Sequence, residues 1–213
     1  MKFLKFIIGL IVLLLVIGAF LPSSTTFERS VTINAPQDLV YEYVISMPRF
    51  NEWSPWHSID PDTKYTFTGP ESGVGHKMAW QSDHENVGSG SQEIIEASAP
   101  NKVVTFLDFG AMGNANAAFT LDELGDGTNV IWSFYTDHGW AIQDRYFGLM
   151  TEKFVGPMYE NGLSKFKTVA EKAAIDKAAA AKAVDEAMRA KAAEMAESAT
   201  DGATESDAAT TDL

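Results

Sequence analysis

Cysteine is absent from this chain of 213 residues, and basic residues are scarce in it. Without cysteine, disulfide bonds and cysteine-ligated metal sites are excluded, although the absence identifies no cellular compartment. The formal net charge is -13, and residues 27–169 hold 19 acidic against 9 basic side chains. Because an acidic domain repels phosphate backbones, we expect no nucleic-acid partner.

Sequence patterns of the common catalytic and metal-binding sites are also missing. There is no G-x-S-x-G motif, and no Ser-His-Asp set can be assembled from spacing. The four histidines lack the i, i+4 and His-Glu spacings of metal sites. The glycine pairs Gly73/Gly75 and Gly88/Gly90 lead into predicted strands and not helices, so no helix N-terminus is available for a phosphate. We therefore expect no metal and no cofactor, and catalytic residues stay unknown.

One stretch near the N-terminus lacks charge altogether. Phe6–Leu21 is an unbroken apolar run, and residues 3–21 together approach the roughly 20 residues that a helix needs to cross a bilayer. Lys2 and Lys5 favour a cytoplasmic N-terminus, so we predict a single-pass anchor in the inner membrane with the domain in the periplasm. The alternative is a cleaved signal peptide and a secreted domain, although no A-x-A pattern ends the run.

Residues 27–137 carry the alternating pattern of β-strands. Phe27–Asn34 predicts a strand with one buried face, and Pro36 then opens a predicted helix that ends near Ile45. An aromatic-rich turn of helix and loop is expected over Met47–Trp56. Short turns between the strands that follow indicate an antiparallel meander. These strands are predicted over Tyr65–Thr68, Val74–Ser82, Ser89–Ser98, Lys102–Phe109, Ala115–Leu124 and Thr128–Asp137.

A long helix is predicted over Arg145–Glu171, because apolar residues recur there every three to five positions. Its expected buried stripe is Phe147, Met150, Phe154, Met158, Leu163, Phe166 and Val169. Only the sheet is large enough to cover that stripe. We therefore predict an α+β helix-grip fold, in which a curved antiparallel sheet wraps on the long C-terminal helix, preceded by one N-terminal transmembrane helix. Pro157 should kink the helix, and Gly162 should lie where helix and sheet approach most closely.

The end of the chain differs in composition from the rest. Residues 171–197 are rich in Ala, Lys and Glu, which predicts a solvated helical extension. Ser198–Leu213 is polar and small, so we expect a disordered acidic tail. The predicted organisation is thus an anchor and short linker over 1–26, a helix-grip domain over 27–170, and an extension with its tail over 171–213.

Several short motifs occur together between Phe27 and Ala170. They are the opening strand into Ala35-Pro36, Glu52-Trp53-Ser54-Pro55-Trp56, Asp60-Pro61, Tyr65-Thr66-Phe67-Thr68-Gly69-Pro70, Gly73-Val74-Gly75, Trp80, Gly88-Ser89-Gly90, Gly127-Thr128-Asn129-Val130-Ile131-Trp132, Val155-Gly156-Pro157 and Glu160-Asn161-Gly162-Leu163. Together they resemble the START-like, or SRPBCC, superfamily in its bacterial polyketide cyclase/dehydrase branch. The resemblance implies a helix-grip fold with a hydrophobic pocket and, for most members, no settled activity.

The aromatic residues allow two interpretations, which are compatible with each other. Large rings pack cores and rims in most domains, or they line a pocket beneath the long helix. Titratable groups for a reaction in such a pocket would be His76, Arg145 and Tyr159, yet each is explained more simply as a rim or core polar residue. The predicted pocket lining is Trp53, Trp56, His76, Met78, Trp80, Phe119, Trp132, Phe134, Phe147, Phe154 and Met158.

The function that we expect from the sequence is binding of a small hydrophobic molecule, lipid-like or aromatic, by a membrane-anchored domain. One alternative is an enzyme that resembles polyketide cyclases or dehydratases. Another is a non-catalytic interaction module with a closed cavity, whose Ala-rich tail meets a protein partner.

Overall fold

The computed structural model describes the backbone of residues 2–208 and the side chains of residues 2–193 and Met195. The chain divides into two compact units, one that ends at Glu171 and one that begins at Lys172. The first unit contains helix α1 (Lys2–Phe20), the whole sheet and the first part of helix α5 (Ile142–Ala208). By length and composition, α1 could cross a membrane.

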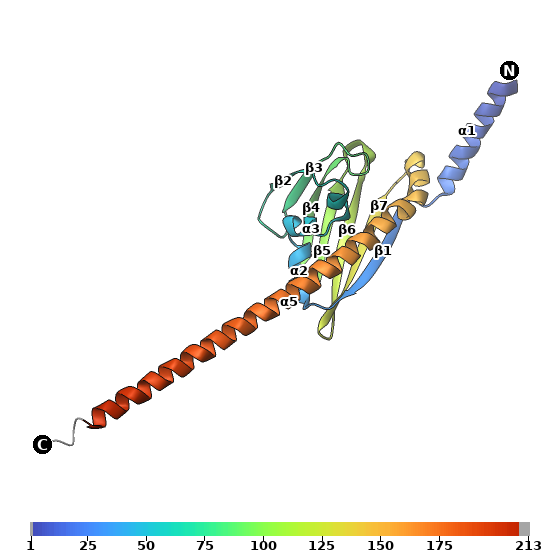
Figure 1. Cartoon of the computed structure of the whole chain (residues 1–213). Helices are drawn as coiled ribbons and strands as arrows, with labels where there is room; N and C mark the ends of the chain where they lie inside the picture. Colours follow the sequence, from blue (N-terminus) through green and yellow to red (C-terminus); the bar gives the residue numbers. More distant parts are fainter. Residues whose placement is uncertain (1, 209–213) are drawn as a thin grey trace. The chain divides into compact units, whose positions relative to one another are not determined.

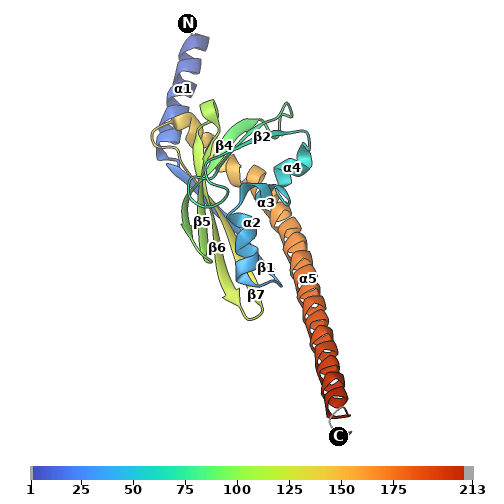
Figure 2. The same ribbon diagram turned by 90° about the vertical axis from the view of Figure 1, so that its left-hand side faces the viewer.

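A seven-stranded antiparallel sheet forms the body of the first unit and curves around α5 (Figures 1 and 2). The strand order is β1-β7-β6-β5-β4-β3-β2, which is a meander with the first strand added beside the last. The strands are β1 (Ser24–Ile33), β2 (Lys64–Thr68), β3 (Lys77–Gln81), β4 (Ser89–Ser98), β5 (Lys102–Asp108), β6 (Asn114–Leu124) and β7 (Gly127–Asp137). This is the predicted α+β helix-grip architecture.

Short helices connect the strands where the chain changes direction. Between β1 and β2 lie α2 (Gln37–Val44), α3 (Met47–Asn51) and α4 (Pro55–Ile59), and the 3-10 turn η1 (Gly110–Met112) joins β5 to β6. Prolines occupy the first turns of α3 and α4, where a missing N–H costs nothing. The sequence predicted one turn of helix in the segment that holds α3 and α4.

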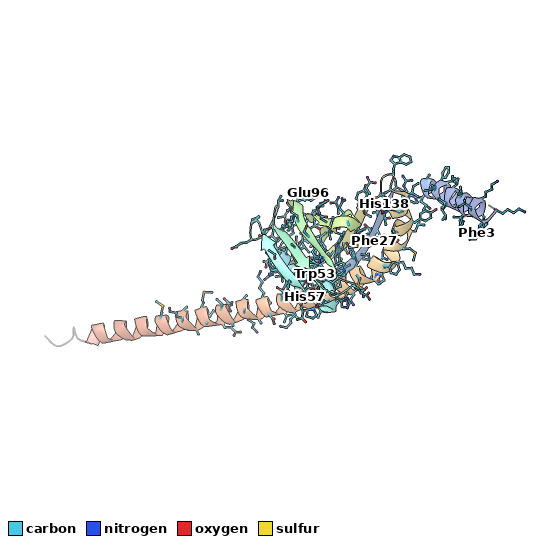
Figure 3. The ribbon with its side chains drawn as sticks, turned by 90° about the horizontal axis from the view of Figure 1, so that it is seen from above. Phe3, Phe27, Trp53, His57, Glu96 and His138 are labelled. Carbon is cyan, nitrogen blue, oxygen red and sulfur yellow. The ribbon has the colours of Figure 1, made fainter. Side chains whose placement is uncertain are left out.

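The concave face of the sheet packs against α5. Alternate side chains of a strand point to the same face, and those on the concave face are mostly apolar and buried. On β6 and β7 this face carries Phe119 and Trp132, which are 1% and 2% exposed. The ring of Trp132 stacks on Tyr159 of α5, with the centroids 3.7 Å apart. Phe27 of β1 stacks on Phe134 of β7 and meets the same tyrosine edge-on, so the first and last strands contribute to one core (Figure 3).

Strand β3 begins three residues later than the sequence predicted. Gly73 and Gly75 have φ angles of 84° and 86°, a left-handed conformation that favours glycine and breaks a strand. The N–H of His76 donates to the carbonyl of Gly73 and closes a turn. His76 therefore lies before the strand, although its carbonyl still accepts from the N–H of Ile94 on β4.

Helix α5 runs through Pro157 without a break, but its buried face differs from the predicted one over the first three turns. Phe147, Met150 and Phe154 are 74%, 42% and 64% exposed. The face that meets the sheet instead carries Gly148 and Gly156, which are buried. A Cβ at Gly156 would lie 2.7 Å from Nη2 of Arg29, so the absence of side chains there lets the helix approach the first strand. Leu163 and Phe166 are buried as predicted.

The second unit is a continuation of helix as far as Ala208. Its large apolar side chains Ile175, Val184, Met188 and Met195 are exposed, which agrees with a solvated extension. The sequence predicted disorder over Ser198–Leu213, whereas the backbone of residues 198–208 is helical. The remaining part of that prediction, residues 209–213, lies outside the described residues.

Candidate functional site

A cavity of about 230 Å³ lies between α5, the α3–α4 segment and the concave face of the sheet. Every strand from β2 to β5, together with β7, contributes to its wall. Its lining residues are Phe50, Asn51, Ser54, Trp56, Tyr65, Met78, Trp80, Val87, Gln92, Leu107, Phe109, Phe134, Val155 and Tyr159. Most of these side chains are apolar or aromatic, as is usual for sites that bind small organic molecules.

Buried aromatic rings behind the cavity hold its α5 wall in place. Trp53 is fully buried and stacks on Phe166 of α5, with centroids 4.4 Å apart and the rings 11° from parallel. It also meets Trp132 edge-on at 5.4 Å, and Figure 3 shows it on the side of the sheet that α5 covers. These contacts make the wall rigid, since aromatic pairs contribute beyond the area they bury.

Tyr159 is the polar group that α5 brings to the cavity. Its side chain is 2% exposed, and this burial raises the pKa of the phenol far above its usual range. The hydroxyl therefore stays protonated, and it makes no hydrogen bond to any residue whose side chain the structure describes. A neutral donor without a partner at the wall of an apolar cavity is suited to a ligand hydroxyl or carbonyl.

Asn51 and Gln92 are the amides of the wall, and each donates a hydrogen bond within the protein. Asn51 Nδ2 donates to Sδ of Met78 at 3.3 Å, while its Oδ1 is buried without a hydrogen-bond partner. Gln92 Nε2 donates to Oγ1 of Thr105 at 3.0 Å, and that hydroxyl donates onward to the carbonyl of Ala117 at 3.3 Å. Both amides thus bond to the sheet, Asn51 to β3 and Gln92 to β5.

Trp80 and Tyr65 form the wall on the β2–β3 side. Trp80 Nε1 donates to the carbonyl of Val87 at 3.3 Å, and the ring fits over Gly90, where a Cβ would lie 2.6 Å from the indole. The hydroxyl of Tyr65 lies 3.4 Å from Nδ1 of His57. Desolvation raises the pKa of Tyr65, so this phenol is also neutral.

The cavity lies toward one end of the sheet. At that end, Gln81 pairs with Lys64 on one side and with Ser89 on the other. Asp108 pairs with Asn114 at the same end. The lining residues Tyr65, Trp80 and Leu107 each lie one position from these ends. The same end holds the pair Ser24 and Asp137, so it is where α1 leads into the sheet and where α5 begins.

Only some of the residues predicted for the pocket meet at this cavity. Trp56, Met78, Trp80 and Phe134 line it, whereas Trp53, Phe119 and Trp132 pack in the core behind it. His76 is buried elsewhere, with Nδ1 bonded to the carbonyl of Pro70. Phe147 and Phe154 point to the outside of α5, and the half-buried Met158 is not part of the lining. The sequence missed Leu107, although alternation with Thr105 could have placed it on the inner face.

Among the described residues, the titratable side chains form no recognisable catalytic set. Within the described residues, no group of three His, Asp or Glu side chains could hold a metal ion. Ser82 Oγ donates to the carboxylate of Asp60, which lowers the pKa of Asp60, but the neighbouring His84 accepts from the backbone of Asn86 and not from the serine. The buried Arg145, another candidate, bonds backbone carbonyls and lies away from the cavity.

The sequence was compared with models of protein families and with curated proteins. The sequence model of the family described as "Polyketide cyclase / dehydrase and lipid transport" matches residues 24–171, which is more than half of the chain. No curated protein matches the sequence.

Solved structures are similar to the chain at low sequence identity. Protein CV1439 from Chromobacterium violaceum is 14% identical, with 69% of this chain and 97% of that chain covered and a TM-score of 0.47. Protein NE0264 from Nitrosomonas europaea is 9% identical, with 70% and 95% covered and a TM-score of 0.49. CalU16 from Micromonospora echinospora is 16% identical, with 71% and 86% covered and a TM-score of 0.40.

Proposed function

The chain belongs to the polyketide cyclase/dehydrase and lipid transport family, and from this membership we propose that it binds a small hydrophobic molecule between its sheet and α5. The observation that carries the proposal is the cavity of about 230 Å³ with a mostly apolar wall and a few polar groups. Walls of this kind favour lipid-like or aromatic ligands over sugars and nucleotides, whose polar groups would lose hydration without compensation.

The size of the cavity limits the ligand. About 230 Å³ is below the roughly 300–1,000 Å³ of pockets that hold drug-sized molecules. A short acyl chain or a compact aromatic compound would fit, whereas a whole phospholipid would not.

The neutral hydroxyl of Tyr159 defines one end of the ligand. A ligand with a single carboxyl, carbonyl or hydroxyl group could accept a hydrogen bond from it. We propose that Tyr159 orients the ligand and that Trp56, Met78, Trp80 and Phe134 contact its apolar part.

Binding without chemistry is favoured over the cyclase or dehydratase alternative. General acid–base catalysis is most efficient when the pKa of the catalytic group lies near the operating pH. Tyr65 and Tyr159, the titratable side chains of the lining, both have raised pKa values, so both stay neutral.

We further propose that α1 anchors the protein in the inner membrane, with the N-terminus in the cytoplasm and the domain in the periplasm. Nearly every side chain of α1 is exposed, and such a surface is stable in hydrocarbon but not in water. Lys2 and Lys5 lie at the N-terminal end of the helix, as the positive-inside rule requires of a cytoplasmic end. A signal peptide that is cleaved after export is the alternative.

The experiment that tests ligand binding uses the full-length protein purified in detergent and two tryptophan substitutions on adjacent residues of β5. Leu107→Trp fills the cavity, whereas Phe106→Trp adds the same ring to the opposite face of the sheet, where Phe106 is 36% exposed. Native mass spectrometry, followed by extraction and mass analysis, should find an apolar molecule on the natural protein and on Phe106→Trp, and little on Leu107→Trp. Equal occupancy in both folded variants, or none in any of them after incubation with fatty acids and small aromatic compounds, would contradict the proposal.

A further inference from the structure

We propose that the start of α5 is a second membrane contact, in which an exposed apolar face lies in the interfacial layer of the bilayer that α1 enters. This face consists of Phe147, Met150 and Phe154, with Trp140 two residues before the start of the helix. The inference rests on the proposed anchor and goes beyond it, because it states how the domain itself meets the lipid.

The first observation is an apolar face that nothing in the first unit covers. Phe147, Met150 and Phe154 are 74%, 42% and 64% exposed, and Trp140 is 83% exposed. Steps of three and four residues put the three helix side chains in one stripe. The stripe faces away from the sheet, since Gly148 and Gly156 on the other side of the helix are buried. Contiguous exposed apolar surface of this kind marks an interaction site.

The second observation is that the start of α5 is bonded to α1. Nη1 of Arg145 donates to the carbonyls of Ala19 and Leu21, at 2.9 and 3.3 Å. These carbonyls belong to the end of α1, where backbone acceptors have no partner in the helix and attract a cation. The hydroxyl of Tyr146 donates to the carbonyl of Leu14 at 2.6 Å.

These contacts set the depth of α5 relative to the proposed membrane segment. Leu14 precedes the end of α1 at Phe20 by six residues, which is about 9 Å of helix rise. Trp140, Ile142 and Tyr146 line a groove with Ile11, Leu14 and Leu15 of α1. If α1 spans a bilayer, the first turn of α5 therefore lies within the headgroup and upper acyl region and not in bulk water.

The chemistry of the segment fits that position. Tryptophan and tyrosine are enriched at membrane interfaces, where one part of the ring is apolar and the other is hydrated. Acidic and basic residues are balanced across residues 142–155, with Asp144 and Glu152 against Arg145 and Lys153. We therefore infer that burial of apolar area drives the contact, and that lipid charge is not needed for it. The lipid surface is the favoured occupant because the face continues from the groove on α1.

The contact has a consequence for the ligand site. The end of the sheet where α5 begins is also the end near which the cavity lies, and its β5–β6 connection carries Phe109 in the lining and Met112, which is 79% exposed. Seating α5 on the bilayer would bring this end close to the lipid, so an apolar ligand could pass between membrane and cavity over a short path.

The absence of cysteine makes a site-specific depth measurement possible in the full-length protein. Single cysteines are placed at Met150 in the stripe, at Leu124 in the β6–β7 hairpin at the opposite end of the sheet, and at Val12 in α1. Met150, Leu124 and Val12 are 42%, 59% and 52% exposed, so the three sites are matched in accessibility. Each cysteine carries the same environment-sensitive nitrobenzoxadiazole dye, and the protein is reconstituted in phosphatidylcholine nanodiscs with or without bromine on the acyl chains.

We expect bromine to quench the dye at Met150 about twofold or more, because an interfacial helix buries its apolar face about 5–10 Å into the acyl boundary. Quenching should be strong at Val12 and absent at Leu124. Adding Phe147→Glu and Phe154→Glu to the Met150→Cys variant should abolish quenching at position 150 and leave the Val12 signal unchanged. Both substitutions replace exposed side chains, so the fold is preserved.

Three outcomes would overturn the inference. Quenching at Val12 alone would leave the anchor standing and refute the second contact. Quenching at neither site would refute both. A dye at position 150 that is shielded from water but insensitive to bromine would show that a protein, such as a second copy of this chain, covers the face.

Discussion

Gly162 of α5 lies against the ring of Trp132 on β7, so closely that a Cβ added to the glycine would be 3.0 Å from Cζ3 of the indole and 3.1 Å from Cδ of Pro55. The same ring stacks on Tyr159 one turn earlier. The missing side chain thus lets the helix approach the sheet. The indole of Trp132 contacts both Gly162 and Tyr159, so the packing at Gly162 also positions the tyrosine that lines the cavity.

Gly162→Leu should therefore destabilise the domain by about 2–3 kcal/mol, because overpacking at a rigid contact forces both the indole and the helix to move. Thermal unfolding followed by circular dichroism measures the effect. Asn161→Leu adds the same side chain at the neighbouring exposed position and serves as the control, with little change expected. Similar unfolding temperatures for the two variants would show that α5 is not held tightly at Gly162.

Tyr159→Phe should weaken binding of a ligand that carries a hydroxyl or carboxyl group about fivefold, since a neutral hydrogen bond contributes about 1 kcal/mol. The affinity for a hydrocarbon of the same shape should stay the same. Quenching of tryptophan fluorescence on titration measures both affinities in the full-length protein. Equal losses for the polar ligand and the hydrocarbon would mean that the substitution disturbs packing on Trp132, and that the hydroxyl does not orient the ligand.

Glu171 gives the stability of the domain a dependence on pH. A hydrogen bond from Lys167 at 2.8 Å, and a second from the backbone N–H of Asn34 at 2.9 Å, lower the pKa of its carboxyl group. A lowered carboxyl pKa stabilises the folded state above the pKa of the unfolded chain, and this contribution is lost as the pH falls through the folded value.

Glu171→Gln should therefore reduce stability above about pH 5 and have little effect below about pH 3. Because the ion pair is partly solvated, with side chains 37% and 26% exposed, the difference should be below about 1 kcal/mol. Unfolding by urea at several pH values measures it. A difference between the two proteins that does not change with pH would assign the effect to packing and not to ionisation.

The full chain should stay in the membrane fraction during alkaline carbonate extraction, and its domain should be accessible to protease added to spheroplasts. The physical reason is that α1 remains covalently attached and is apolar from Phe6 to its end at Phe20. The intact mass should be that of the full chain, 23.2 kDa. A shorter, soluble product would support the cleaved signal peptide, and protection from external protease would contradict the periplasmic orientation.

Local patterns accounted for the secondary structure well. Ser89–Ser98 matches β4 at both ends, and the ends of the other strands agree within three residues, with the starts of β1 and β3 furthest from the prediction. Alternation is a local property that follows from the geometry of a strand, and glycine-rich turns end strands wherever they occur. The late start of β3 was missed because the left-handed conformations of Gly73 and Gly75 depend on the turn that the surrounding loops complete.

The composition of the candidate site was predicted only in part. Trp56, Met78, Trp80 and Phe134 line the cavity, but Trp53 and Trp132 are core residues. Sequence cannot distinguish these roles, because a tryptophan has the same preference for burial in either place. The short helices α3 and α4 decide which ring faces the cavity and which ring faces α5.

By itself, the sequence determined the helix-grip fold class, the apolar N-terminal helix and the acidic domain, since each follows from composition or from a period in the chain. Only the tertiary structure decided which side of α5 is buried. Both sides carry large apolar residues, and the apolar stripe through Phe147 and Phe154 is the stronger pattern. The side that carries Gly148, Gly156 and Gly162 faces the sheet. A helix can approach a curved sheet closely only where its residues have no side chain. Phe147 and Phe154 therefore point outward.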